Sequence, residues 1–295
     1  MPSTTITTTV PDLGAVEVTV DDLGTGRPVL LLHGGAGPQS VTAFADRLAH
    51  EHGVRVLVPT HPGFAGTPRP EQLGTVRQLG AVYAALLDTL DLTDVVVAGN
   101  SAGGWTAAEL ALTGSPRVAR LVLVDAAGLE VPDHPVADFS ALTFPELARL
   151  SYADPERFRI DPGTMPPAAQ AAMAGNRATL AVYAGTAMVD PGLRGRLASV
   201  AVPTVVVWGE ADGIVDVEVG RAFAAAVPGA RFELLPGTGH LPQLESPDRL
   251  LAVLAGVLGE PVSRCRTPGP ARTPASPRRG SGRCPAGRSR GRWGW

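Results

Sequence analysis

The chain has 295 residues, of which 44% are hydrophobic, and this suits one globular domain or one domain that carries an insertion. Its net charge of −3 is unevenly placed, because nine of the 25 basic residues and none of the 28 acidic residues follow residue 261. Residues 1–261 therefore hold 16 basic and 28 acidic side chains, a balance of −12. A body this acidic argues against a nucleic-acid partner.

The N-terminal segment, the apolar runs and the two cysteines bear on the expected location of the protein. The N-terminal residues 1–14 have no basic start and no apolar core of signal-peptide length, so we expect a cytoplasmic protein. No apolar run approaches the roughly 18 residues of a membrane helix, so we expect no membrane association. Both cysteines, Cys265 and Cys284, lie near the C-terminus, which leaves the body without a disulfide or a cysteine-based zinc site. A homo-oligomer is compatible with the sequence.

Short β-branched runs alternate with amphipathic stretches along most of the chain. Strands are predicted at residues 5–10, 15–21, 29–32, 54–58, 94–98, 118–124, 204–208 and 231–235. Helices are predicted at residues 41–51, 76–90, 102–112, 219–227 and 247–258. Apolar strands separated by helices indicate an α/β fold, with a mostly parallel twisted central sheet flanked by helices.

One stretch interrupts this alternation. Residues 130–196 hold no convincing strand, are rich in Ala and Pro, and contain short helical pieces at 145–150 and 168–174. Because an irregular connection of this length is uncommon in a compact domain, we predict a helical cap at 130–196. The core would then consist of a first part, 1–129, and a second part, 197–261.

The last segment, residues 262–295, is dominated by Arg, Pro, Gly and Ser, and Val262 is its only aliphatic residue larger than Ala. It cannot bury enough apolar surface to offset the entropy lost on ordering, so we predict a disordered basic tail. Such a tail is either an interaction segment or a chance extension of the reading frame.

The segment Gly99-Asn100-Ser101-Ala102-Gly103 fits the pattern G-x-S-x-G between a predicted strand and a predicted helix. A nucleophile at this place sits on a sharp turn that lifts its hydroxyl above the sheet, and small neighbours let strand and helix approach closely. The first N–H groups of the helix also favour negative charge at that point. Ser101 is therefore the predicted nucleophile; the alternative is a glycine-rich turn with an incidental serine.

Serine needs an adjacent base, and His240 is the best candidate among six histidines. It follows the last predicted strand, which places it at the carboxyl edge of the sheet together with Ser101. The other histidines lie at a helix end, in the cap or in loops: His33, His50, His52, His61 and His134. His33 is expected to hold its loop by hydrogen bonds, and His61 has no obvious partner.

The acid that orients the histidine is expected between Ser101 and His240 in the sequence. Asp212 follows the strand 204–208 and is the preferred residue. Asp216 and Glu210 are rivals nearby, and Asp125 is a rival at the end of an earlier strand.

These motifs resemble the α/β-hydrolase superfamily over roughly residues 5–259. Within it, Gly99 to Gly104 and the segment His33-Gly34-Gly35 are similar to capped serine hydrolases, namely meta-cleavage-product hydrolases, which break carbon–carbon bonds, and cofactor-free haloperoxidases. The carbon–carbon hydrolases usually carry an aromatic residue after the catalytic histidine, where this chain has Leu241. Ser101 stands where dehalogenases and epoxide hydrolases of this fold use Asp, which argues against both activities.

The resemblance also implies an oxyanion hole and a pocket. In such enzymes the loop after the third strand and the residue after the nucleophile each give a backbone N–H to the oxyanion, so Gly35 and Ala102 are predicted donors. The substrate-pocket candidates are small, amide or apolar residues around this point and in the cap: Gly34, Asn100, Trp105, Phe64, Phe139, Phe144, Tyr183 and Leu241. The alternative for the aromatic residues is that they form hydrophobic core.

The predicted function is a serine hydrolase that cleaves a small, largely apolar carbonyl substrate through an acyl-enzyme. The scissile bond would belong to a carboxylic ester, a lactone or the carbon–carbon bond of a diketone. No cofactor or metal ion is predicted, and the predicted partner is a small-molecule substrate, with neither nucleic acid nor membrane. Two alternatives stay open: non-hydrolytic chemistry of the same triad, as in perhydrolases and hydroxynitrile lyases, and a ligand sensor built on the hydrolase fold.

Overall fold

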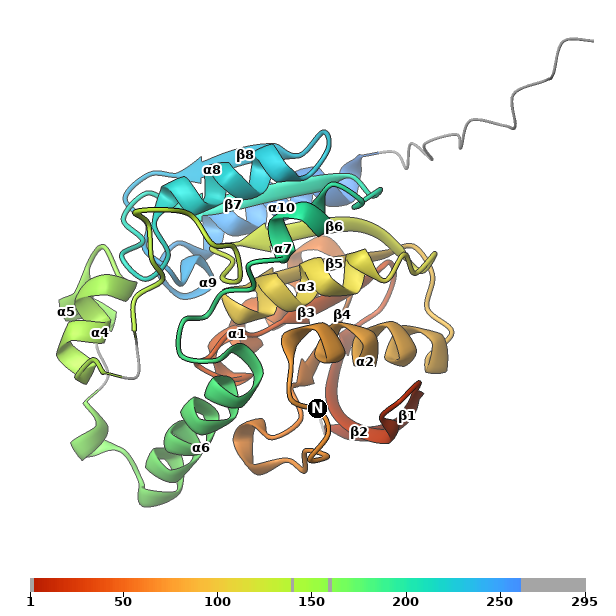
Figure 1. Ribbon diagram of the computed structural model, residues 1–295, viewed down its shortest axis with the longest axis horizontal. Helices are drawn as coiled ribbons and strands as arrows, with labels where there is room; N and C mark the ends of the chain where they lie inside the picture. Colours follow the sequence, from red (N-terminus) through yellow and green to blue (C-terminus); the bar gives the residue numbers. More distant parts are fainter. Residues whose placement is uncertain (1–2, 139–140, 159–160, 261–295) are drawn as a thin grey trace, which may run out of the picture. The chain divides into compact units, whose positions relative to one another are not determined.

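A computed structural model describes residues 3–138, 141–158 and 161–260. Its centre is an eight-stranded sheet with the strand order β1-β2-β4-β3-β5-β6-β7-β8 (Figure 1). The strands are β1 (Thr4–Val10), β2 (Gly14–Gly24), β3 (Pro28–Leu32), β4 (Arg55–Thr60), β5 (Val95–Asn100), β6 (Val118–Val124), β7 (Thr204–Gly209) and β8 (Arg231–Leu235). The pairs β1–β2 and β2–β4 are antiparallel and the others are parallel, so the predicted mostly parallel sheet is confirmed.

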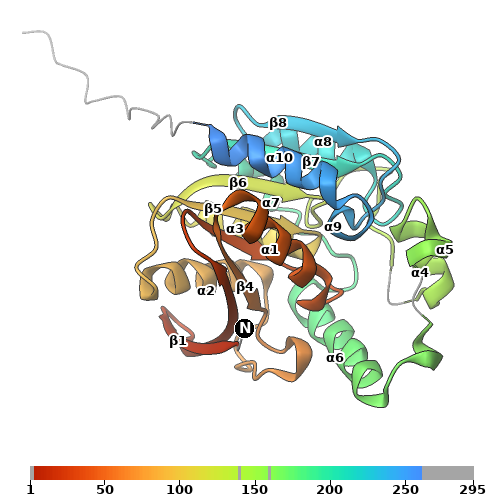
Figure 2. The same ribbon diagram turned by 180° about the vertical axis from the view of Figure 1, so that it is seen from behind.

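Helices cover the sheet on both faces. One face carries α2 (Val76–Thr89), α3 (Ala102–Leu112) and α8 (Val217–Ala226). The other, seen in Figure 2, carries α1 (Gln39–His52), α9 (Pro242–Glu245) and α10 (Pro247–Gly259). Strands β5 and β7 are buried along their whole length because both of their faces lie under helices, which explains why they read as unbroken apolar runs.

Between β6 and β7 the described residues form helices and no strand. They are α4 (Phe144–Ser151), α5 (Pro155–Phe158), η2 (Pro162–Thr164), α6 (Pro167–Ala184) and α7 (Leu193–Leu197). In both views α4 and α5 lie toward the same end of the strands as α9, which follows the carboxyl end of β8 (Figures 1 and 2). Helix α7 includes residue 196, the predicted end of the cap, and packs near α3 and α8. The domain boundaries 1–129, 130–196 and 197–261 stay predictions.

Helices α5, α7 and α9 have no counterpart among the predicted elements, and α6 is longer than predicted. Helix α6 spans 18 residues, whereas only residues 168–174 were expected to be helical. It buries only Asn176, Leu180, Tyr183 and Ala184, so its Ala-rich sequence carries almost no amphipathic signal. Helix α9 was not predicted, because four residues are too few to show a helical period.

The predicted tail, 262–295, and its two cysteines lie outside the described residues. Among the residues that are described, no helix combines the length and apolarity needed to cross a membrane.

Candidate active site

Ser101 lies on a strained turn between β5 and α3. Its backbone angles, φ 57° and ψ −123°, fall outside the regions that L-residues usually adopt. A Cβ at Gly99 would lie 2.2 Å from the Gly103 carbonyl oxygen, and one at Gly103 would lie 2.3 Å from the Leu32 carbonyl oxygen. Both positions must therefore be glycine for the strand, the turn and the helix to approach this closely.

His240 and Asp212 form a buried pair at the same edge of the sheet. His240 Nδ1 lies 2.8 Å from Asp212 Oδ2, and the two side chains are 7% and 0% exposed. Asp212 Oδ1 accepts the N–H groups of Ile214 and Val215 at 2.8 and 3.0 Å, which fixes the carboxylate. Because Nδ1 faces a carboxylate, it carries the ring proton, and Nε2 keeps a lone pair that can take a proton.

The two nearby rivals for the acid have other partners. Asp216 caps α8 by accepting the Glu218 N–H at 2.7 Å, and its Oδ1 lies 3.2 Å from His134 Nδ1. Glu210 accepts the Gly237 N–H at 2.9 Å. Neither carboxylate is bonded to His240, so Asp212 is the acid that the geometry favours.

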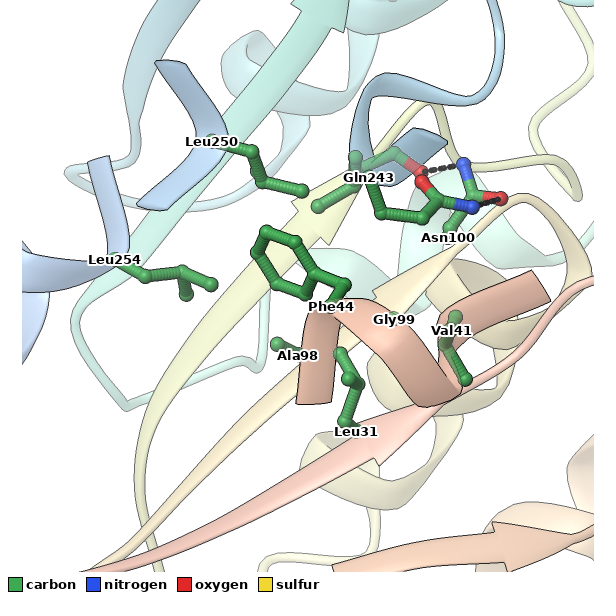
Figure 3. Close-up of a pocket in the computed structure, with 10 residues that line it drawn as sticks. Leu31, Val41, Phe44, Ala98, Gly99, Asn100, Gln243, Leu250 and Leu254 are labelled. Atoms are coloured by element: carbon green, nitrogen blue, oxygen red, sulfur yellow. Dashed lines mark hydrogen bonds between the residues drawn. The ribbon is translucent and has the colours of Figure 1, made fainter. Parts of the chain in front are cut away.

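Asn100, the residue before Ser101, is hydrogen-bonded to the loop that carries His240. Its Nδ2 donates to the His240 carbonyl at 2.9 Å and to the Val124 carbonyl at 3.3 Å, and its Oδ1 accepts from Gln243 Nε2 at 3.1 Å. Figure 3 shows the Asn100 and Gln243 amides side by side. Both N–H groups of Asn100 are thus used within the protein, and its place in a substrate pocket stays a prediction.

A cavity of about 10 Å³ lies behind Asn100, on the face covered by α1 and α10 (Figure 3). Its lining is mainly apolar and includes Phe44, Leu250 and Leu254. This volume holds about one water molecule, so the cavity is no substrate pocket. Gln243 had no role in the sequence analysis, and no motif marks it.

The glycine-rich loop after β3 lies directly against Ser101. A Cβ at Gly34 would lie 2.9 Å from Ser101 Cβ and 3.0 Å from the Asn100 carbonyl oxygen. A Cβ at Gly35 would lie 2.5 Å from Leu180 Cδ2, so α6 closes over this loop. Ala102 begins α3, and its N–H has no acceptor within the helix.

His33 and His61 bind the backbone of this loop through hydrogen bonds. His33 Nδ1 donates to the Gly34 carbonyl at 2.8 Å, and its Nε2 accepts the His61 N–H at 3.1 Å. His61 Nε2 donates to the His33 carbonyl at 2.8 Å, and its Nδ1 accepts from the Tyr83 hydroxyl. These bonds assign one neutral tautomer to each ring.

Burial favours the same neutral forms. It lowers the pKa of His33 to about 4, against a weaker opposing effect of the hydrogen bond to Gly34. Burial, followed by the charge that His33 would carry, also holds the pKa of His61 well below its usual value. His33 therefore serves its loop as expected, and His61 has a partner, Tyr83, that lies 22 positions further along the chain.

Comparison with known proteins identifies the family of this chain. Residues 29–253 match the model of the alpha/beta hydrolase family. The chain belongs to this family. It is thus a hydrolase-class enzyme, as the motifs indicated.

Three relatives of this α/β hydrolase illustrate the match. A 2-hydroxy-6-oxononadienedioate/2-hydroxy-6-oxononatrienedioate hydrolase of Paraburkholderia phymatum is 28% identical over 84% of this chain and 93% of its own. A 2-hydroxy-6-oxo-2,4-heptadienoate hydrolase of Pseudomonas putida is 38% identical, but over only 39% of this chain and 43% of its own. The structure of a thermophilic esterase from Thermogutta terrifontis superposes with a TM-score of 0.69, at 28% identity, over 86% of this chain and 98% of its own.

In this α/β hydrolase the last turn of α4 contacts both loops of the His–Asp pair. The Leu150 carbonyl accepts the Gly213 N–H at 2.8 Å, next to Asp212. The Ser151 carbonyl accepts the His240 N–H at 2.7 Å. The relative placement of the two loops therefore depends on a helix from the predicted cap.

Helix α6 of the hydrolase makes similar contacts with the loop after β4. Tyr183 donates its hydroxyl to the Pro62 carbonyl at 2.8 Å, and Thr179 donates to the Gly63 carbonyl at 2.9 Å. Tyr183 is only 5% exposed and packs in the core between α6 and this loop, and its place in a substrate pocket stays a prediction.

Two other aromatic pocket candidates, Phe64 and Trp105, are also buried. Phe64 packs against the His33 ring, with centroids 5.0 Å apart, and is 1% exposed beneath the loop. Trp105 is 4% exposed and donates to Glu109 Oε1 at 3.3 Å. Both belong to the hydrophobic core, because a fully enclosed aromatic ring stabilises the fold most by packing there.

The remaining pocket candidates keep their status as predictions. Phe144 is half-buried at the start of α4, under the guanidinium of Arg177 at 5.3 Å from the ring centre. Leu241 is half-buried and directly follows His240. Phe139 lies outside the described residues.

Proposed function

We propose that this protein is a serine hydrolase in which Ser101, His240 and Asp212 form the catalytic triad. Ser101 Oγ attacks the carbonyl carbon of the substrate and passes its proton to His240 Nε2, while Asp212 stabilises the imidazolium. The N–H groups of Gly35 and Ala102 bind the oxyanion. The tetrahedral intermediate then collapses and expels the leaving group, which takes the proton from His240. Water hydrolyses the acyl-enzyme with His240 as base.

One observation carries this proposal. The Asp212–His240 pair is oriented with the basic nitrogen of the imidazole available, on a loop whose backbone is bonded to Asn100, the residue before Ser101. Two further features support it. Ser101 has the strained conformation expected of an exposed nucleophile, and Gly34 leaves no side chain between the oxyanion loop and Ser101.

The proposed substrate is a small, largely apolar carboxylic ester or lactone. Support comes from the half-buried apolar side chain of Leu241 beside the proposed base and from the similarity to a bacterial esterase along nearly the whole chain.

A second candidate is hydrolysis of the carbon–carbon bond of a vinylogous diketone. It is favoured by the curated relative of P. phymatum, which covers most of the chain and whose name specifies a dienedioate substrate of this kind. Against it stands Leu241, at a position where such hydrolases usually carry an aromatic residue.

The experiment is a panel of p-nitrophenyl esters, lactones and vinylogous diketones, measured on the wild type, Ser101→Ala and His240→Ala. Each variant should lose at least about 10³-fold in kcat on every substrate that the wild type turns over. Ser199→Ala, which removes an exposed serine far along the sequence, serves as the matched control and should retain full activity. Near-normal turnover by either triad variant would refute the proposal.

The same panel separates the alternatives. Rapid labelling of Ser101 by a fluorophosphonate together with many turnovers supports a hydrolase. Labelling followed by a single turnover and a large thermal shift would indicate a ligand sensor. A rate that depends on added peroxide or cyanide-bearing alcohols would indicate non-hydrolytic chemistry.

A further inference from the structure

Asp125 is a fully buried carboxyl group that the proposed mechanism does not use. It follows β6 directly, with φ 45°, and its side chain has no exposed surface. Its Oδ1 accepts the Gly209 N–H at 2.7 Å, whereas its Oδ2 has no N–H or O–H donor among the described residues. A buried carboxylate oxygen without a donor is costly, so the state of this oxygen needs an explanation.

Asp125 lies beside the proposed acid and base. Asp125, Asp212 and His240 each contribute a polar atom to a group in which all atoms lie within 4.8 Å of one another. The two carboxyl groups have unequal surroundings, because Asp212 faces two backbone N–H groups and His240, while Asp125 faces only the Gly209 N–H. Two carboxyl groups this close do not both ionise in a buried site, and the one with fewer donors keeps the proton.

We infer that Asp125 is a neutral carboxylic acid in the folded enzyme and that its hydroxyl donates a hydrogen bond to the Asp212 carboxylate. Asp125 is then a positioning residue, which adds a fourth donor to Asp212 without a second negative charge beside the imidazolium. The inference rests on the proposed function for its role in catalysis, but the protonation state of Asp125 does not.

The surrounding charges agree with this assignment. Burial, followed by the charge of Asp212, raises the pKa of Asp125 well above its usual value, and the bond from the Gly209 N–H opposes this only in part. The other acidic groups on the adjoining loops have partners elsewhere. Glu210 faces Gly237, Asp216 faces the start of α8 and His134, and Glu245 accepts the N–H groups of Asp154 and Gly239.

The neutral form of Asp125 matters because a charge at this position would act on His240, the proposed base. A second carboxylate at this distance would stabilise protonated His240, so that a smaller fraction of the histidine would be free to accept the Ser101 proton near neutrality. A neutral donor orients Asp212 and leaves this balance unchanged.

Infrared spectroscopy tests the protonation state without any reference to activity. At pH 8 the wild type should show the carbonyl band of a buried protonated carboxylic acid, and Asp125→Asn should lack it. Asp133→Asn, at an exposed aspartate with a positive φ that asparagine tolerates, is the matched control and should keep the band. Absence of the band from the wild type would overturn the inference even if the triad is correct.

Kinetics test the positioning role. Asp125→Ala removes the donor to Asp212 and should lower kcat by about 10- to 100-fold with little change in KM. Asp125→Asn can still accept the Gly209 N–H and donate to Asp212, so it should restore kcat to within about threefold of the wild type. It should also keep the pH at which kcat/KM reaches half its maximum.

Three outcomes contradict the inference. If Asp125 is charged in the wild type, Asp125→Asn will move the half-maximal pH of kcat/KM downward by roughly one unit or more. If size alone matters, Asp125→Leu, which has a similar volume but no donor, will be as active as Asp125→Asn. If the three groups hold a metal ion, a chelator will lower the wild-type rate. Where Asp125→Ala fails to fold, the infrared band and the Asp125→Asn profile decide.

Discussion

Two buried polar clusters flank Ser101, and they differ in charge. The histidine cluster, His33, His61 and Tyr83, lies under the oxyanion loop, and every ring nitrogen in it pairs with a backbone group or a hydroxyl. The carboxylate cluster, Asp125, Asp212 and His240, lies at the ends of β6, β7 and β8 and contains the carboxylate–imidazole pair. Burial favours the neutral form in both clusters, and Asp212 differs from Asp125 in the number of hydrogen-bond donors that it faces.

The carboxylate cluster should be the more sensitive to a change of charge. Asp212→Asn replaces the carboxylate with a neutral amide, which no longer stabilises the imidazolium and favours the wrong ring tautomer of His240. We expect kcat to fall by about 10³- to 10⁴-fold, measured on the best ester of the panel. Asp216→Asn, which removes a nearby carboxylate but keeps the cap of α8, should retain activity. Retained activity in Asp212→Asn would move the acid to another residue.

The histidine cluster should make the fold sensitive to acid. His33 binds a proton below pH 6.5 when unfolded but only below about pH 4 when folded, so its contribution is complete above pH 6.5 and is lost as the pH falls toward 4. The loss amounts to roughly 3 kcal/mol of unfolding free energy. Urea unfolding of the wild type and His33→Gln across this range isolates the contribution of His33, because His61 acts in the same direction and Asp125, neutral when folded, acts in the opposite one.

His33→Gln carries no titratable ring and should flatten this dependence by about one proton, although the variant is less stable at pH 7. His52→Gln, at an exposed histidine that ends α1, is the matched control and should keep the wild-type slope. If His33→Gln had the same slope as the wild type between pH 6.5 and 4, His33 would bind its proton as readily in the folded state as in the unfolded state, contrary to this prediction.

The smallest expected effect concerns the hydroxyl of Tyr83. Tyr83→Phe leaves His61 Nδ1 without a donor in a buried site, which should lower the unfolding free energy by about 1–3 kcal/mol. Since the bonds from His61 and His33 to the loop backbone remain, kcat should change by less than about threefold. A loss of kcat as large as that of Asp125→Ala would mean that the two clusters are equally close to the chemistry.

The sequence predicted the elements whose signals are local. Helix α3 has the predicted bounds, and β3 and β6 agree within one residue, because apolar runs and the flanking glycines mark them directly. The pairing of Asp212 with His240 followed from the position of each residue after a strand. Helix α6 was too short in the prediction because an alanine-rich helix that contacts the body at a few residues has no clear periodicity.

The positions of the strands along the chain, the turn at Ser101 and the edge of the sheet that gathers the reactive side chains were determined by the sequence itself, since each depends on glycine spacing and apolar runs that are continuous along the chain. Only the tertiary structure decided which way Asn100 points, which partner His61 has and how close Asp125 lies to Asp212. These contacts join residues from different strands and loops. Their geometry is set by how the layers pack, which no local pattern encodes.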